Sequence, residues 1–220
     1  MTMAKKSETT PQEIISIFTQ SVLENESFPK SVYRFCKDNK LSETDFYAHY
    51  ASIDNLKQAV WLAFYDNTYG LLHKNSDYHA LSRRDRLLTF FYTFFEVLLL
   101  NRSYILFVHA SEENKMNKLS QLKQLRTAVK TFASELIEEG NETKSRLAQN
   151  PVPLFSEATW AQLLLLVNYW LNDTSKGFEK TDALIEKSVT VAFEVFDNTR
   201  LNAFLDLGKF LWKETTTTTH

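Results

Sequence analysis

The chain has 220 residues, with only 4 Gly and 4 Pro, and 25 Lys+Arg against 27 Asp+Glu give a formal net charge of −2. Gly and Pro together average about 12% of residues. They shape turns and bulges, so their scarcity argues against a β-sandwich, a β-barrel or a glycine-loop nucleotide fold. The near-neutral charge excludes a strongly basic protein that holds nucleic acid by bulk charge. The composition therefore predicts an all-α protein.

Signals for export or membrane insertion are absent from the sequence. The single cysteine, Cys36, cannot form an intramolecular disulfide, which favours a reducing compartment. Residues 1–13 are polar and lack the apolar run of a secretory signal. The longest apolar stretch, residues 87–101, is interrupted by Glu96 and is too short to span a bilayer. We therefore expect a cytoplasmic protein.

The N-terminal region predicts four helices. Residues 10–13 (Thr-Pro-Gln-Glu) combine an N-cap hydroxyl, a proline at the first helical position and the glutamate of a capping box. Apolar residues at helical spacing continue from there to about Asn25. A second helix is expected over about 29–38. Ser42 and Ser52 then stand as N-caps of a very short third helix and of a fourth helix.

The remainder predicts longer helices, near 81–101, 103–113, 117–140, 155–174 and 181–212. The segment 150–153 (Asn-Pro-Val-Pro) is the clearest linker, because residues before proline avoid helix. We expect three parts. These are a helix-turn-helix domain over 1–65, a helical regulatory and dimerisation domain over 66–214, and a disordered tail over 215–220.

Short helix, tight turn, short helix is the arrangement of a helix-turn-helix unit, whose second helix enters the major groove of DNA. The residue types in this region strengthen the interpretation as a helix-turn-helix. The block Leu41-Ser42-x-x-x-Phe46-Tyr47-x-His49-Tyr50-x-Ser52-x-x-x-Leu56, preceded by Ser31, resembles the DNA-binding domain of TetR-family repressors in order and spacing. The resemblance implies a TetR-like all-α fold.

The resemblance also implies roles in DNA binding. Hydroxyls and helix N-termini contact phosphates, and side chains that reach base edges specify sequence. The expected DNA-binding residues are Lys30, Ser31, Ser42, Thr44, Tyr47, His49 and Lys57. For Phe46 and Tyr50 we favour a core role. A core role for Tyr47, and a simple capping role for Ser42, are the alternatives.

The sequence departs from the family pattern at several positions. Glu26 and Lys40 stand where the family usually has glycine, and Ile53 replaces a frequent lysine. Glu43 and Asp45 bring negative charge to the short recognition helix, although affinity for DNA rests mainly on neutralised phosphates. These departures weigh against DNA binding more than against the fold.

The C-terminal helices are rich in apolar residues, which indicates a core with a dimer interface or a pocket for a hydrophobic ligand. The resemblance implies both a pocket and dimerisation through the last two helices. The expected pocket residues are Phe94, Phe95, Leu98, Phe107, His109, Trp160, Leu164 and Asn168. The expected dimer residues are Leu163, Val167, Val189, Phe193 and Phe196.

The segment 201–212 is amphipathic. It either packs back on the body of the protein or forms a helix at a membrane surface. With a membrane-surface helix at this position, the chain weakly resembles a ubiquinone-biosynthesis lipid-binding family, which uses the TetR fold without binding DNA. Peripheral membrane contact through this segment is thus one candidate interaction.

The sequence gives no support for an enzymatic function. The five histidines lack metal-ligand spacing, the four glycines are isolated, and Cys36 sits on an apolar stripe. We expect no enzyme activity, no cofactor and no metal. The leading hypothesis is a TetR-like transcriptional regulator that binds double-stranded DNA as a homodimer under the control of a hydrophobic small molecule. The alternative is a TetR-fold lipid-binding protein that has lost DNA binding and assists an enzyme at the membrane.

Overall fold

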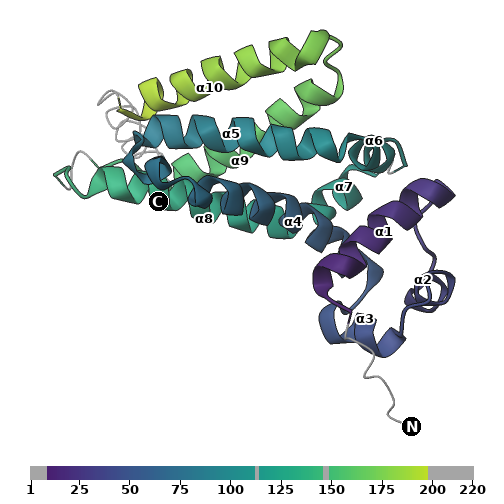
Figure 1. Cartoon of the computed structure of the whole chain (residues 1–220). Helices are drawn as coiled ribbons and strands as arrows, with labels where there is room; N and C mark the ends of the chain where they lie inside the picture. Colours follow the sequence, from purple (N-terminus) through teal and green to yellow (C-terminus); the bar gives the residue numbers. More distant parts are fainter. Residues whose placement is uncertain (1–8, 112–113, 146–148, 198–220) are drawn as a thin grey trace, which may run out of the picture. The chain divides into compact units, whose positions relative to one another are not determined.

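A computed structural model describes residues 9–111, 114–145 and 149–197, which form helices and turns without a strand. The predicted tail over 215–220 and the amphipathic segment 201–212 lie outside the described residues. Figure 1 shows the helices along the chain. They are α1 (Pro11–Asn25), α2 (Val32–Asp38), α3 (Glu43–His49), α4 (Ile53–Lys74), η1 (Ser76–Ala80), α5 (Arg83–Leu100), α6 (Arg102–Ser111), α7 (Lys115–Gln121), α8 (Lys123–Asn141), α9 (Val152–Leu171), η2 (Lys176–Phe178) and α10 (Glu179–Asp197).

The all-α prediction is confirmed, and most helix starts follow local signals. Thr10 caps α1 in the expected capping box with Glu13. The second helix begins at Val32, later than predicted, because the hydroxyl of Ser31 caps it. The predicted helix 117–140 is two helices, α7 and α8, separated at Leu122. The last predicted helix, 181–212, is described as far as Asp197.

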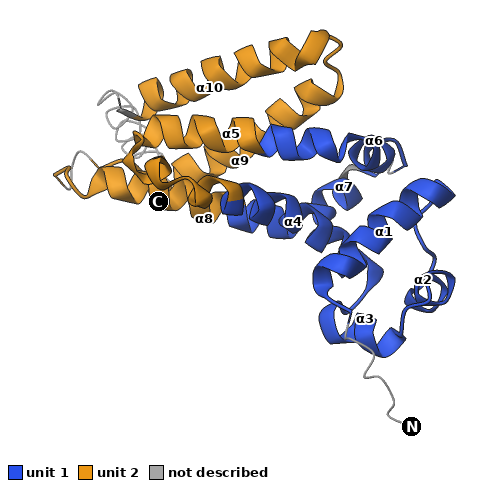
Figure 2. Ribbon diagram, in the orientation of Figure 1, with its two compact units in different colours: residues 1–70, 94–128 blue, residues 71–93, 129–220 orange. Residues whose placement is uncertain are grey.

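The chain divides into two compact units (Figure 2). Unit 1 comprises residues 1–70 and 94–128, and unit 2 comprises residues 71–93 and 129–220. Helices α4, α5 and α8 each contribute residues to both units. The predicted boundary at residue 65 stays a prediction.

Aromatic side chains fill the core of unit 1. Phe35 of α2 meets Phe18 of α1 edge-on at 5.7 Å between ring centroids and Phe46 of α3 at 5.9 Å. All three rings are at most 1% exposed. Phe46 and Tyr50 are core residues, as predicted, and the Tyr50 hydroxyl donates to the carbonyl oxygen of Pro11 at 3.1 Å. These contacts hold α1, α2 and α3 as one body.

The core of unit 2 is aromatic as well. Phe90 of α5 packs against Phe132 of α8 at 4.6 Å between centroids. Phe155 at the start of α9 packs edge-on against Phe193 and Phe196 of α10, at 5.7 and 4.9 Å. Helices α9 and α10 therefore form a hairpin whose inner seam is buried.

A buried carboxylate fixes the turn of this hairpin. Asp173 follows α9, and its two oxygens accept from the backbone N–H and hydroxyl of Ser175 and of Thr181, at 2.7 to 3.0 Å. The hydrogen bonds from Ser175, followed by those from Thr181, outweigh burial and hold the pKa of Asp173 well below its usual range. The turn therefore depends on an ionised carboxylate.

We predict an acid-dependent loss of stability at this turn. A depressed carboxyl pKa stabilises the folded state above the ordinary value of 3.8, and this contribution is lost as the pH falls towards the folded-state pKa. Thermal unfolding of the wild type and of Asp173→Asn, followed between about pH 6 and pH 3, tests this. The stability difference between them should shrink as the pH falls, and a constant difference would show that Asp173 does not act through its charge.

Within the described ranges, no single helix is long and apolar enough to cross a membrane. Helices α5 and α6 pass such a test only as a pair, which is bent by 81°.

Candidate DNA-binding and ligand-binding sites

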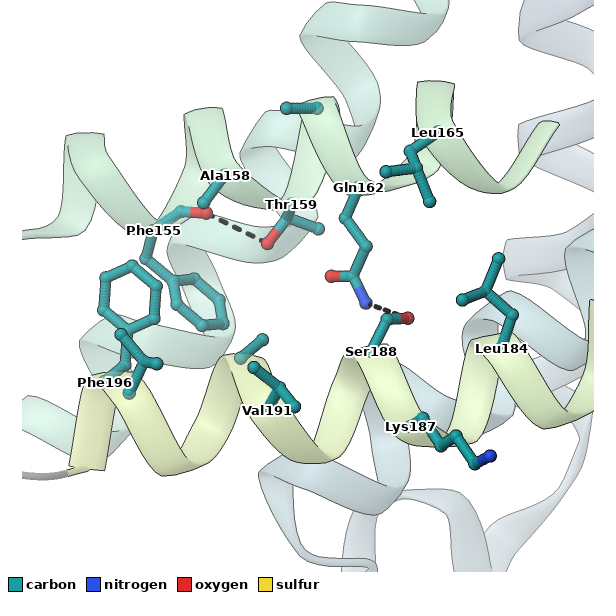
Figure 3. Close-up of a pocket in the computed structure, with 13 residues that line it drawn as sticks. Phe155, Ala158, Thr159, Gln162, Leu165, Leu184, Lys187, Ser188, Val191 and Phe196 are labelled. Carbon is teal, nitrogen blue, oxygen red and sulfur yellow. Dashed lines mark hydrogen bonds between the residues drawn. The ribbon is translucent and has the colours of Figure 1, made fainter. Parts of the chain in front are cut away.

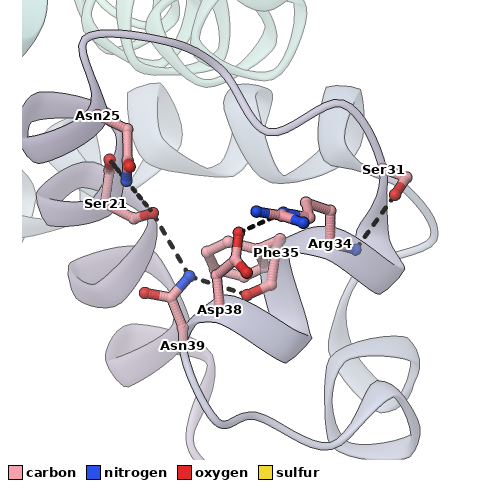
Figure 4. A network of polar contacts seen from close by, with 7 residues as sticks. All are labelled: Ser21, Asn25, Ser31, Arg34, Phe35, Asp38 and Asn39. Carbon is pink, nitrogen blue, oxygen red and sulfur yellow. Dashed lines mark hydrogen bonds and ion pairs between the residues drawn. The ribbon is translucent and has the colours of Figure 1, made fainter.

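The α2–α3 region has the capped geometry of a helix-turn-helix. The Ser31 hydroxyl accepts from the Arg34 N–H, and the Ser42 hydroxyl accepts from the Thr44 N–H, both at 3.1 Å. Figure 4 shows how the turn after α2 is tied to α1: the Asn39 amide donates to the Phe35 carbonyl at 2.8 Å and to the Ser21 hydroxyl at 3.4 Å. The start of α3 is thereby held in place.

A left-handed residue closes the turn. The Leu41 N–H donates to the Cys36 carbonyl at 2.9 Å and the Lys40 N–H to the Lys37 carbonyl at 3.4 Å, the pattern of a Schellman motif. Lys40 itself has φ 57°, so it takes the left-handed position, whereas the preceding Asn39 has φ −103°. Glu26, after α1, likewise has φ 47°. Both family glycine positions keep their left-handed conformation without glycine.

Replacing Lys40 with glycine should stabilise the protein. A side chain at positive φ costs about 1 kcal/mol, which Lys40→Gly removes. Lys37→Gly is the matched control, because Lys37 lies inside α2 and a glycine there should destabilise by about 0.5–1 kcal/mol. Chemical denaturation measures both. A Lys40→Gly variant no more stable than the wild type would contradict the strain assigned to this turn.

Five of the predicted DNA-binding residues are exposed: Lys30, Ser31, Thr44, Tyr47 and His49. Tyr47 is the most informative of them, since its ring is 55% exposed although it lies beside the fully buried Phe46. Ser42 is half-buried and its hydroxyl is engaged in capping. The helix α3 thus presents an aromatic and a hydroxyl side chain to solvent.

Two of the predicted residues, the exposed His49 and the half-buried Lys57, already have partners within the protein. The Nε2 of His49 lies 3.0 Å from the carbonyl oxygen of Thr9, to which it donates. The ammonium of Lys57 lies 4.1 Å from the ring centroid of Phe28 and 3.4 Å from a carboxylate oxygen of Asp54. Both side chains would have to leave these contacts, or share them, to bind a phosphate.

Negative charge surrounds the start of α3. Glu43 and Asp45 lie in its first turn, where carboxylates favour the positive end of the helix dipole. Cys36 is buried nearby, and burial, followed by the charges of Glu43 and Asp45, raises the pKa of its thiol. This environment disfavours a thiolate, and Glu43 and Asp45 repel phosphates.

The predicted pocket residues fall in both units. In unit 1, Phe94, Phe95 and Leu98 are buried, Phe107 is half-buried and His109 is exposed. In unit 2, Trp160 is buried, Leu164 is half-buried and Asn168 is exposed. In unit 1, the three buried residues of α5 thus form an apolar wall. No three His, Cys, Asp or Glu side chains of the described residues are placed to hold a metal ion.

The predicted dimer residues lie mostly inside one protomer. Leu163, Val189, Phe193 and Phe196 are at most 7% exposed, and Val167 is half-buried. The opposite face of the same two helices is open instead. Leu165, Val191 and Val195 are 56, 56 and 43% exposed. A dimer surface on this hairpin would therefore use residues that the sequence prediction did not name.

An apolar surface groove runs along α9 and α10 (Figure 3). Its volume is about 590 Å³, and its lining includes Leu165, Leu184, Val191 and Val195. The Gln162 amide donates to the Ser188 hydroxyl across it at 2.8 Å. The sequence signal for this groove is the run of four leucines at 163–166, because a helix that is apolar all round needs a cover on both faces.

Comparisons with known proteins agree with this architecture. Residues 86–211 match the family model of the tetracyclin repressor-like C-terminal domain. The fatty acid degradation regulator FadR of Bacillus halodurans is 15% identical with a TM-score of 0.56, over 86% of this chain and 96% of that one. The transcriptional regulator FadR of Bacillus subtilis, solved with stearoyl-CoA, is 12% identical with a TM-score of 0.55, over 82% and 98%. No curated protein matches the chain.

The family model covers more than half of the chain, so this chain belongs to the TetR family of transcriptional regulators. The fold is that of the family, and the two FadR structures share it.

Proposed function

We propose that the protein is a transcriptional regulator that binds DNA as a homodimer and is controlled by a hydrophobic ligand. The observation that carries the DNA-binding part is the capped α2–α3 unit, with Thr44 and Tyr47 exposed on α3. A helix of this kind enters the major groove, and a dimer reads two half-sites about 34–36 Å apart. Ser31 would contact a phosphate on the flank.

We further propose that the hydrophobic ligand is a long-chain acyl compound. The FadR of Bacillus subtilis was solved with stearoyl-CoA, and this chain has its fold. Phe94, Phe95 and Leu98 supply buried apolar surface on α5 in unit 1. Ligand binding would favour one arrangement of the recognition helices over another and so change the affinity for DNA.

We assign dimerisation to the open face of the α9–α10 hairpin. The exposed side chains of Leu165, Val191 and Val195 form an apolar stripe that one protomer does not cover. A two-fold dimer buries the same surface on both copies, which suits such a stripe. The buried residues Leu163 and Val189 support the hairpin from within.

Two features favour a second candidate, a TetR-fold lipid-binding protein without DNA binding. Glu43 and Asp45 occupy the first turn of α3, and Lys57 is already paired with Asp54. Both features weaken the attraction for phosphates.

Titration of a fluorescent duplex from upstream of the protein's own gene, with and without stearoyl-CoA, tests the proposal. The regulator should bind in a sequence-dependent way, and stearoyl-CoA should change the affinity. Binding of stearoyl-CoA without binding of DNA would favour the second candidate.

A further inference from the structure

Three buried polar atoms in the described part of unit 1 make no hydrogen bond within the protein. They are the indole Nε1 of Trp61, the hydroxyl of Tyr104 and the side-chain oxygen of Gln121. The three residues are 6, 2 and 5% exposed. About nine-tenths of buried polar groups in folded proteins are hydrogen-bonded, so each of these three unpaired atoms needs an explanation.

Contacts join some of the helices around these atoms. The ammonium of Lys118 on α7 donates to the carbonyl oxygen of His109 on α6 at 2.8 Å, which joins the helices of Gln121 and Tyr104. Lys123, the first residue of α8 and two residues after Gln121, lines a surface groove together with Leu62, which follows Trp61 on α4. All three residues belong to one compact unit.

We infer that Trp61, Tyr104 and Gln121 bind the polar part of an acyl ligand, and that this ligand is an acyl thioester or amide rather than a free fatty acid. The inference rests on the proposed function and deepens it, because it names the polar contacts and the class of acyl compound. The apolar wall of Phe94, Phe95 and Leu98, in the same unit, would face the acyl chain.

The hydrogen-bonding groups of these three residues distinguish an acyl thioester or amide from a free fatty acid. An indole N–H only donates, whereas an amide oxygen such as that of Gln121 only accepts. Burial raises the pKa of the Tyr104 phenol, so it stays a neutral hydroxyl that can donate. The ligand must therefore offer both an acceptor and a donor. The carbonyl and amide N–H groups of an acyl-CoA do so, whereas a carboxylate only accepts and is costly to bury.

The position of Trp61 also couples ligand binding to the helix-turn-helix formed by α2 and α3. Trp61 lies on α4, which begins at Ile53, shortly after α3 ends at His49. A hydrogen bond to Trp61 would form only in the arrangement of α4 that suits the ligand. Ligand binding and the position of α3 would thereby be linked through one helix.

Tyr104→Phe tests the inference with two readouts. It removes a hydroxyl that has no partner in the protein, so it should raise the Tm of the ligand-free protein by about 2–4 °C. Calorimetric titration should show that it weakens stearoyl-CoA binding about tenfold. Gln121→Met, which keeps the volume but removes the amide, should weaken the same binding. The wild type should bind stearoyl-CoA more tightly than stearate.

Tyr50→Phe is the matched control, because the Tyr50 hydroxyl has a partner in Pro11. It should lower the Tm and leave stearoyl-CoA affinity unchanged. If Tyr104→Phe and Gln121→Met bind stearoyl-CoA like the wild type, or if stearate binds as tightly as stearoyl-CoA, the inference is wrong while the proposed function stands. If the wild type binds neither compound, the ligand part of the proposed function fails as well.

Discussion

Tyr47→Ala should weaken binding to the protein's own upstream DNA by at least about 30-fold, because a specific side-chain contact contributes about 1–3 kcal/mol per half-site. The ring of Tyr47 is 55% exposed on α3, the helix that would enter the major groove. Its removal should leave the helical content intact, since the core beneath is formed by the fully buried Phe46. Fluorescence anisotropy with a labelled duplex measures the affinity, and circular dichroism measures the fold.

Tyr69→Ala is the control for this experiment. Tyr69 is a 37% exposed tyrosine on α4, outside α2 and α3, so its loss should not change DNA binding. If Tyr47→Ala binds DNA like the wild type, α3 is not the recognition helix. If both variants lose affinity equally, the effect is not specific to the α2–α3 unit.

Val191→Glu should raise the dimer dissociation constant by at least about 100-fold. It places a carboxylate in the apolar groove of both copies, and an unpaired buried charge costs about 3–5 kcal/mol. The monomer should stay folded, because Val191 is 56% exposed within one protomer. Sedimentation equilibrium over a range of concentrations measures the dissociation constant.

Leu71→Glu makes the matching control, with the same charge at a 45% exposed apolar residue that does not line the groove. It should leave the dimer intact. A Val191→Glu variant that dimerises normally would show that the α9–α10 groove is not the dimer surface. Loss of the dimer in both variants would point to a general effect of added charge.

Local signals predicted the helix-turn-helix region well. The hydroxyls of Thr10, Ser31 and Ser42 cap the helices that follow them, because capping depends only on a few neighbouring residues. The positive φ of Glu26 and Lys40 also follows local geometry, since each residue lies just after the end of a helix. The break at Leu122 had no such signal, as neither glycine nor proline marks it.

The dimer and ligand residues were harder to predict, because they depend on which face of a helix the rest of the chain covers. Helix α9 is apolar on all sides, so its sequence could not tell the buried Leu163 from the exposed Leu165. The unpaired polar atoms of Tyr104 and Gln121 could not be predicted either, because a missing partner is visible only once the surroundings are known.

The salt dependence of the affinity for the protein's own upstream DNA decides whether this TetR-family chain binds DNA specifically. Affinity should be measured on this duplex and on a scrambled one over about 50–200 mM salt. We expect specific binding, with the logarithm of the association constant falling steeply and linearly with the logarithm of the salt concentration, because Lys and Arg side chains neutralise phosphates. Equal affinity for both duplexes, or binding only at the lowest salt, would contradict specific DNA binding. The negative charges of Glu43 and Asp45 would then explain why the protein no longer binds DNA specifically.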